Sequence, residues 1–261
     1  MRSILLGLAV TLFLFGPARS ETPVDVELVL AVDVSLSMTS GELEIQRRGY
    51  AEALVSEDVV EAIAYGGPHG QIALTYVEWA GPSSQRVIID WTLVRSLEDA
   101  EAFAAQLTTA FPDALPRTAI SSIIDHSVKR FEGNGFAGQR LVIDISGDGP
   151  NNGGRPVLAA KTEAAARGIT INGLPLMTRE GQWLQFDLED LDEYYRHCVI
   201  AGPMAFVIPV LRWEDFPSAV RRKLVLELSN SRPVLTPLRR VTGYDCLIGE
   251  KIWQRYFGDW N

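Results

Sequence analysis

The sequence predicts a three-layer α/β/α fold, in which helices cover both faces of a doubly wound, mainly parallel sheet of about six strands. Runs that are apolar almost throughout alternate with amphipathic stretches between residues 24 and 228, a pattern typical of parallel strands buried on both faces. Two of these runs, 71–79 and 85–91, are separated by a short Gly-Pro-Ser-Ser linker region. Because this connection is too short for a helical crossover, a hairpin is expected, which places one antiparallel strand at the edge of the sheet.

The elements follow from the period of the apolar residues. Strands are predicted at 24–34, 71–79, 85–91, 140–145, 169–176 and 205–210. Helices are predicted at 42–64, with a break near Ser56, and at 97–110, 119–131, 156–167, 188–195 and 213–228.

After Ser229 this pattern is lost, and a segment rich in proline and arginine leads into an aromatic tail from Tyr244 to Trp260. Residues 231–261 are too few to bury a core of their own. We therefore expect one domain over residues 21–230 and a C-terminal extension, 231–261, that packs on it. The aromatic residues of the tail are predicted to make docking contacts and not a ligand cage.

The first twenty residues have the pattern of a secretory signal peptide. Arg2 precedes an apolar run at 4–15, and the small residues Ala18 and Ser20 stand at positions −3 and −1 of a predicted cut. The alternative is an uncleaved membrane anchor, but the run is shorter than the ~20 residues that a spanning helix needs. We expect an exported protein that has no membrane contact after cleavage.

Charge argues against some classes of binding partner, and the cysteine content predicts a disulfide. Without Arg2 and Arg19 the chain has 22 basic and 33 acidic residues, a net charge of −11, which argues against binding to nucleic acid or anionic lipid. Cys198 and Cys246 are the two cysteines, and an exported chain meets an oxidising compartment. A disulfide between them is expected, with two separate buried thiols as the alternative.

Three loops that follow strand ends carry oxygen-bearing side chains. Asp33, Ser35 and Ser37 follow the first strand, Thr118 stands before the helix at 119–131, and Asp148 follows the strand at 140–145. In a doubly wound sheet, ligands bind beyond the carboxyl ends of the strands. Oxygen donors suit a hard cation, with Mg²⁺ favoured, whereas zinc would need histidine or cysteine ligands.

Each of these residues also has a local explanation. Ser37 or Ser40 can cap the helix that follows, and Thr118 can cap its own helix. The Asp148-Gly149 pair, taken alone, is typical of a turn. The occurrence of five oxygen-bearing residues at three loops of one sheet edge favours a cation site over separate caps and a turn.

In this chain order, Asp33-x-Ser35-x-Ser37, Thr118 and Asp148-Gly149 resemble the metal-ion-dependent adhesion site (MIDAS) of von Willebrand factor type A domains. The resemblance covers most of the chain, from about residue 24 to 229. Within that superfamily the sequence is similar to a group of exported bacterial proteins of uncharacterised function, through three segments: Ser146–Asn152, Cys198–Ile200 and Lys223–Glu227. The resemblance implies a location in the bacterial periplasm or outside the cell.

The resemblance also implies a role for each residue. Ser35 and Ser37 would coordinate Mg²⁺ through their hydroxyls, Asp33 and Asp148 directly or through waters, and Thr118 would join or leave the shell as the site changes state. Mn²⁺ and Ca²⁺ are alternatives to Mg²⁺. An exposed Asp or Glu of a protein or peptide partner would complete the coordination.

Two positions depart from the family pattern. Pro116 and Arg117 replace the glycines that often precede the threonine, and Arg117 would either help to hold an incoming carboxylate or repel the cation. Gly147 stands where many relatives have a threonine.

We therefore expect a non-enzymatic binding module and keep two alternatives. One is a metal-dependent phosphatase or hydrolase, since such enzymes carry an aspartate after the first strand. They generally use a second carboxylate two residues later, where this chain has Ser35, so the proton carrier is missing. The other is a structural or assembly protein with a vestigial metal site, in which the C-terminal tail makes the contacts.

Overall fold

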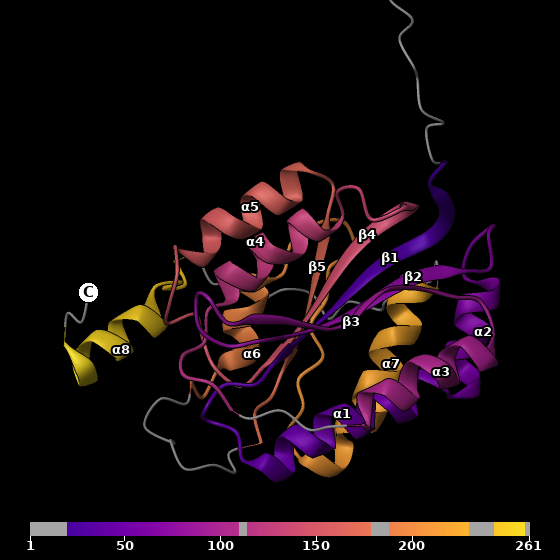
Figure 1. The fold of residues 1–261 in the computed structure, drawn as a ribbon. Coiled ribbons are helices and arrows are strands. Elements are labelled where there is room, and N and C mark those ends of the chain that lie inside the picture. Colours follow the sequence, from indigo (N-terminus) through magenta and orange to yellow (C-terminus); the bar gives the residue numbers. More distant parts are fainter. Residues whose placement is uncertain (1–19, 110–113, 179–187, 230–242, 259–261) are drawn as a thin grey trace, which may run out of the picture.

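A computed structural model describes residues 20–109, 114–178, 188–229 and 243–258. Within them, five strands form one sheet in the order β3-β2-β1-β4-β5 (Figure 1). Neighbouring strands are parallel except for β2 and β3, which pair antiparallel as an edge hairpin. The strands are β1 (Thr22–Asp33), β2 (Ile72–Trp79), β3 (Gln85–Val94), β4 (Phe136–Gly147) and β5 (Thr170–Pro175).

Helices cover both faces of the sheet, which confirms the predicted three-layer architecture. One layer contains α1 (Ser40–Leu54), α2 (Glu57–Tyr65), α3 (Leu97–Leu107) and α7 (Phe216–Leu228). The other contains α4 (Ile120–Arg130), α5 (Val157–Ala166) and the short α6 (Leu191–Tyr194). A further helix, α8 (Ile248–Phe257), lies at the left-hand edge of the molecule in Figure 1.

Strand β1 lies at the centre of the sheet because both of its faces are apolar. Leu28 and Leu30 face one core, while Val29 and Ala31 face the other, and all four are fully buried. A strand whose successive side chains point to opposite faces can be apolar throughout only if both faces are covered. This central position brings the carboxyl end of β1 next to the ends of β2 and β4.

The predicted sixth strand at 205–210 is not a strand. Its backbone pairs with β5 and the residue after β5 through two isolated bridges, Gly173 with Val207 and Leu176 with Val210. The Phe206 N–H also donates to Asn172 Oδ1 at 3.1 Å. Pro209 lies between the two bridges and has no N–H to donate to a ladder. Within the described residues the sheet therefore has five strands, where about six were expected.

The helix boundaries also refine the predictions. The break near Ser56 is confirmed, since α1 ends at Leu54 and α2 begins at Glu57. The helix expected at 188–195 is shorter at its start, and after Tyr194 it continues as a π-helix, Tyr195–Val199. The helix expected at 213–228 begins as a 3₁₀ turn, Trp213–Asp215.

Several expectations fall on undescribed residues. Of the signal peptide predicted at 1–20, all residues except Ser20 lie outside the described residues. Residues 230–242, which include the start of the predicted C-terminal extension, lie outside them as well. In the part of the chain that the structure describes, no helix is long and apolar enough to cross a membrane.

Candidate metal centre

The candidate metal centre lies where β1 and β4 end side by side. The two strands are parallel and in register up to Val32 and Ser146, so the loops that follow them leave the same edge of the sheet. Asp33 is the last residue of β1, Ser35 and Ser37 lie in the loop that follows it, and Asp148 directly follows β4. The structure therefore places the residues predicted from two separate segments at one edge.

The hydroxyls and one carboxylate of these loops are in contact. Ser35 Oγ lies 3.0 Å from Ser37 Oγ and donates to Asp148 Oδ1 at 3.3 Å. Ser35 is nearly fully buried, whereas Ser37 and Asp148 are partly exposed. The three oxygens thus form a cluster that is open to solvent on one side.

Asp33 lies beneath this cluster and is inaccessible to solvent. Its Oδ1 accepts a hydrogen bond from the Ser35 backbone N–H at 2.8 Å, and Gln46 Nε2 donates to its main-chain carbonyl at 3.1 Å. Its Oδ2 receives no hydrogen bond from any described residue. Burial raises the pKa of the Asp33 carboxyl well above its usual value, and the nearby charge of Asp148 raises it further.

Thr118 reaches the same pocket from a third loop. Its chain is fixed by two hydrogen bonds to Asn152: the Thr118 N–H donates to Asn152 Oδ1, and the Asn152 N–H donates to the Thr118 carbonyl, both at 2.8 Å. Leu115, in the same loop, pairs with the Ser35 loop through a parallel bridge. Thr118 lines the pocket together with Ser35, Ser37 and Asp148.

The capping alternatives are wrong for both helices. The N-cap of α1 is Thr39, which forms a capping box with Glu42, so neither Ser37 nor Ser40 is needed there. Helix α4 is preceded by Ala119, and no side chain caps it from that position. Both Ser37 and Thr118 are therefore left to face the pocket.

Tyr195 explains why position 147 is a glycine. A Cβ atom at Gly147 would lie 2.9 Å from Tyr195 Oη and 3.0 Å from Asp33 Oδ2, so the threonine found in many relatives has no room. Tyr195 is fully buried and donates to the Gly147 carbonyl at 3.4 Å. Its pKa is raised well above the usual value by burial, and further by Asp33 and Asp148, which keeps the hydroxyl protonated as a donor.

Sequence reasoning missed Tyr195, and it missed the role of Asn151. Asn151 is fully buried and joins three elements: its N–H donates to Tyr194 Oη at 3.1 Å, its Oδ1 accepts from the Ser121 N–H at 3.0 Å, and its Nδ2 donates to Glu250 Oε1 at 2.7 Å. The double asparagine after Asp148 was a signal, because buried amides commonly bridge loops by hydrogen bonds.

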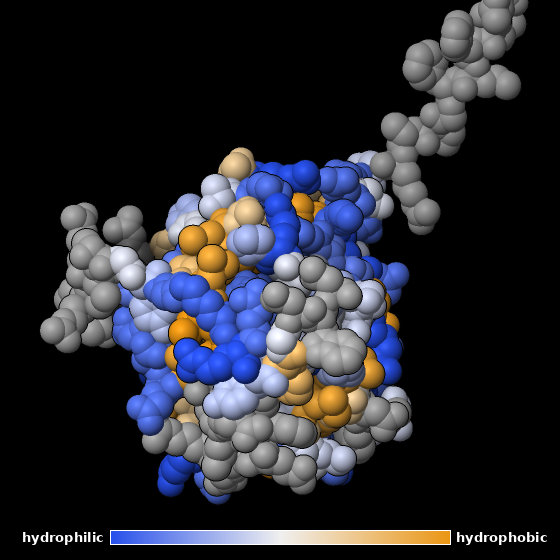
Figure 2. Space-filling model, turned by 90° about the vertical axis from the view of Figure 1, so that its left-hand side faces the viewer, coloured by the Kyte–Doolittle hydropathy of each residue, from blue (hydrophilic) through white to orange (hydrophobic). Residues whose placement is uncertain are grey.

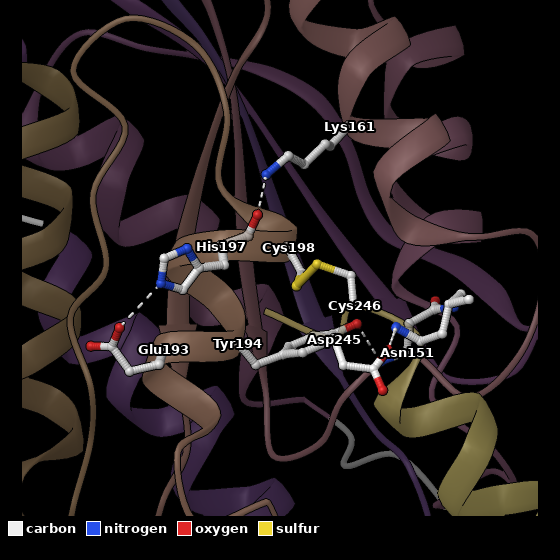
Figure 3. Close-up of a disulfide and its surroundings, with 9 residues drawn as sticks. Asn151, Lys161, Glu193, Tyr194, His197, Cys198, Asp245 and Cys246 are labelled. Carbon is white, nitrogen blue, oxygen red and sulfur yellow. Dashed lines mark hydrogen bonds and ion pairs between the residues drawn. A yellow bond between two sulfur atoms is a disulfide. The ribbon is translucent and has the colours of Figure 1, made fainter. Parts of the chain in front are cut away.

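A disulfide anchors the segment before α8. Cys198 and Cys246 are bonded, with their Cα atoms 5.5 Å apart, and Figure 3 shows Tyr194 and Asn151 beside them. The C-terminal tail is thereby held next to the loop that carries Asp148. Packing of the tail near its cysteine was expected from the sequence, but its position beside the oxygen cluster was not.

The donor set fits a hard divalent cation. Among the described residues, no group of three or more His, Cys, Asp or Glu side chains is arranged to hold a metal, so a site of the zinc-enzyme type is not present in that part of the chain. The cluster instead offers neutral hydroxyls and two carboxylates, one of which has a buried oxygen without a hydrogen-bond donor. A cation would compensate this oxygen, because a buried charge is stable only when it is paired or coordinated.

Comparison with known proteins identifies the family and the fold of the chain. The sequence profile of a family described as "protein of unknown function (DUF1194)" matches residues 23–232. A search of curated protein sequences finds no match.

The solved structures that share the fold include those of three proteins. Proximal thread matrix protein 1 of the mussel byssus has a TM-score of 0.58 at 14% identity, covering 81% of this chain and 49% of that one. The pilus adhesin SpaC of Lactobacillus rhamnosus GG has a TM-score of 0.56 at 9% identity, with coverage of 80% and 32%. A von Willebrand factor type A protein of Catenulispora acidiphila has a TM-score of 0.54 at 14% identity, and the match covers 78% of this chain and 43% of that one.

This chain thus spans less than half the length of each of these structures. A second structure of the mussel protein, with a TM-score of 0.55 at 15% identity over 80% of this chain and 48% of that one, has a zinc-occupied MIDAS motif. At such identities the likeness shows the fold, while the family match covers most of the sequence. The chain therefore belongs to the family described as protein of unknown function DUF1194, and it has the fold of a von Willebrand factor type A domain.

Proposed function

We propose that this chain is an exported, non-enzymatic adhesion module that binds an acidic side chain of a protein partner through a divalent cation. The observation that carries the proposal is the contact of Ser35 Oγ with Ser37 Oγ and Asp148 Oδ1 above the buried Asp33. These oxygens lie at the strand ends, where doubly wound sheets bind ligands. Matched structures include a pilus adhesin and a byssus protein with a metal-occupied MIDAS motif.

The charges of the site support ligand capture. Asp33 and Asp148 together balance the charge of a divalent ion, while Ser35, Ser37 and Thr118 contribute neutral oxygens. When bound, the cation supplies an electrophilic centre that accepts a carboxylate oxygen. Because Ser37 and Asp148 are partly exposed, a partner's carboxylate has access to this side of the site.

Mg²⁺ is the cation that suits these donors best. It is commonly held by one or two carboxylates and keeps several waters in its shell. Mn²⁺ and Ca²⁺ also take oxygen ligands and are alternatives. The zinc in the MIDAS motif of the mussel protein makes Zn²⁺ a useful comparison in the metal titration.

Two features support a non-enzymatic role. Ser35 occupies the position at which aspartyl-phosphate enzymes generally have a second carboxylate, so no acid or base stands there. The Asp33 side chain is inaccessible to solvent, which keeps its carboxylate from attacking a phosphoester. The predicted signal sequence and the disulfide between Cys198 and Cys246 support export.

Metal-dependent capture of partners from the exported fraction tests the proposal. Immobilised wild-type protein is compared with Ser35→Ala, in Mg²⁺ and in EDTA, and calorimetry measures Mg²⁺ binding to each. Ser40→Ala is the matched control, because Ser40 is exposed and lies near the site without lining the pocket. We expect partners to be retained by the wild type and by Ser40→Ala in Mg²⁺, and to be lost in EDTA and with Ser35→Ala.

The alternatives make different predictions. Retention in EDTA and with Ser35→Ala, together with loss on deletion of residues 231–261, would favour an assembly protein whose tail makes the contacts. Mg²⁺-dependent hydrolysis of p-nitrophenyl phosphate that Asp33→Ala abolishes would contradict the non-enzymatic assignment.

A further inference from the structure

A pocket of about 180 Å³ opens beside the candidate metal centre. Its lining combines the hydroxyls and carboxylate of the centre with three side chains of α8: Ile252, Trp253 and Phe257. A cavity of about 150 Å³ is large enough to bind benzene. The pocket therefore has room for one branched aliphatic or aromatic side chain.

Apolar side chains around this pocket are exposed to solvent. Leu36 is 51% exposed and Phe257 is 39% exposed, and both line the pocket. On this side of the molecule, hydrophobic surface lies among hydrophilic atoms (Figure 2). Exposed apolar surface around a polar centre is typical of a binding site.

Helix α8 is a fixed wall. The disulfide of Cys246 with Cys198 lies two residues before the helix begins. A Cβ atom at Gly249 would lie 2.1 Å from the Asn151 carbonyl oxygen, so the helix backbone is in direct contact with the loop after β4. Glu250 Oε1 also accepts a hydrogen bond from Asn151 Nδ2 at 2.7 Å. The pocket is therefore largely formed before a ligand arrives.

Arg117 adds a positive charge to the same pocket. Its φ of 72° lies in the left-handed region, which is uncommon for a residue other than glycine. Its guanidinium carbon lies 4.5 Å from the centre of the Trp253 ring, and no carboxylate of the described residues forms an ion pair with it. Strained residues of this kind concentrate at ligand sites. Since the whole chain has a net charge of −9, this local positive charge favours an acidic ligand here.

We infer that the pocket between the metal centre and α8 binds a large apolar side chain of the partner, one or two residues from the acidic residue that reaches the cation. The partner segment is thus an Asp or Glu close to Leu, Ile, Met or Phe, with Arg117 facing its negative charge. This inference rests on the proposed function, since the acidic residue is held by the cation. It adds the selectivity that the metal centre alone lacks.

A peptide panel tests the inference. Each peptide contains one Asp within glycine spacers, and Leu, Phe or Ala is placed at each position from −2 to +2. Binding to the full chain is measured by fluorescence polarisation in Mg²⁺ and in EDTA. We expect Leu or Phe at one of these positions to bind at least about tenfold more tightly than Ala.

Variants of α8 connect the preference to the pocket. Phe257→Ala opens the pocket and Ile252→Trp fills it, and both are expected to reduce the preference for Leu and Phe while Mg²⁺ affinity is unchanged. Gln254→Ala is the matched control, because Gln254 is exposed on the same helix and does not line the pocket. Circular dichroism confirms that each variant is folded.

The outcomes separate the two proposals. Equal Mg²⁺-dependent binding of Ala, Leu and Phe peptides would overturn the pocket and leave the proposed function standing. A preference for Leu or Phe that persists in EDTA would overturn the proposed function, and with it the link between pocket and cation. Binding of no peptide in Mg²⁺ would overturn both proposals. A preference for Leu or Phe that Phe257→Ala and Ile252→Trp leave intact would overturn the pocket alone.

Discussion

Replacement of Asp33 by asparagine is expected to stabilise the protein in EDTA, and addition of Mg²⁺ is expected to cancel or reverse this difference from the wild type. The Asp33 side chain is fully buried, and its Oδ2 receives no hydrogen bond from a described residue. Burial, together with the charge of Asp148, disfavours the ionised form and raises its pKa. Without a cation, removal of this negative charge should therefore stabilise the fold.

The magnitude follows from the burial of this group. An unsatisfied buried polar group costs about 1–3 kcal/mol, and more when it is charged, so Asp33→Asn should raise the free energy of unfolding by about that amount in EDTA. At a Mg²⁺ concentration a hundredfold above its Kd, binding adds about 2.7 kcal/mol to the wild type. The variant, which has one carboxylate fewer, gains little. The wild type then equals or exceeds it, with a shift in Tm of about 2–4 °C for each kcal/mol.

Urea unfolding followed by tryptophan fluorescence, in EDTA and in Mg²⁺, measures both effects, with the Kd taken from calorimetry. Asp58→Asn is the matched control, since the Asp58 side chain is 63% exposed and, among the residues that the structure describes, its one ion pair is with Arg221, at 3.7 Å. A variant less stable than the wild type in EDTA would refute the idea of an uncompensated charge at Asp33. Equal stabilisation of both proteins by Mg²⁺ would remove Asp33 from the cation site.

Three further predictions concern groups around the sheet and the site. Burial raises the pKa of the Asp144 carboxyl to about 7, even though the nearby Lys223 ammonium opposes this rise. The folded protein therefore binds a proton at Asp144 more tightly than the unfolded chain does. Stability should fall by up to about 1.4 kcal/mol per pH unit as the pH rises from about 4 to about 7, and urea unfolding of Asp144→Asn should not show this slope. Replacing Cys198 and Cys246 together by serine should lower the free energy of unfolding by about 4 kcal/mol, because the disulfide joins residues 48 apart; a loss below about 1 kcal/mol in the same assay would contradict this. Arg117→Gly should leave stability within about 1 kcal/mol of the wild type, because relief of left-handed strain offsets the lost contact with the indole ring; the affinity for an Asp peptide in Mg²⁺ should nevertheless fall, and an unchanged Kd would exclude a ligand contact.

Much of the fold could be predicted from local patterns. The edge hairpin followed from the short connection between β2 and β3, and the break between α1 and α2 followed from Ser56. The prediction of a strand at 205–210 was wrong, because an apolar run does not reveal whether a neighbouring strand offers it a continuous ladder of hydrogen bonds. Here Val207 and Val210 each make one bridge, with Pro209 between them.

The oxygen cluster could be predicted in part for a topological reason. Residues that directly follow parallel strands meet at one edge, whatever the details of their side chains, so Asp33, Ser35 and Asp148 were expected together. The choice between capping and facing the pocket was not decided locally. Thr39 is the N-cap of α1 and forms a capping box with Glu42. Which of Ser37, Thr39 and Ser40 caps the helix is decided only when the first residue of the helix is fixed.

The sequence by itself determined which oxygens stand at the strand ends and that a segment with the second cysteine follows the last long amphipathic stretch. Only the tertiary structure decided that Asp33 is fully buried, that Tyr195 fills the space beside Gly147, and that α8 walls the pocket at the metal centre. The physical reason is that strand-end positions depend on the order of neighbouring segments along the chain. The packing of Tyr195 and α8 depends instead on contacts between residues far apart in sequence, such as Asn151 with Glu250, and no local pattern of the sequence encodes such contacts.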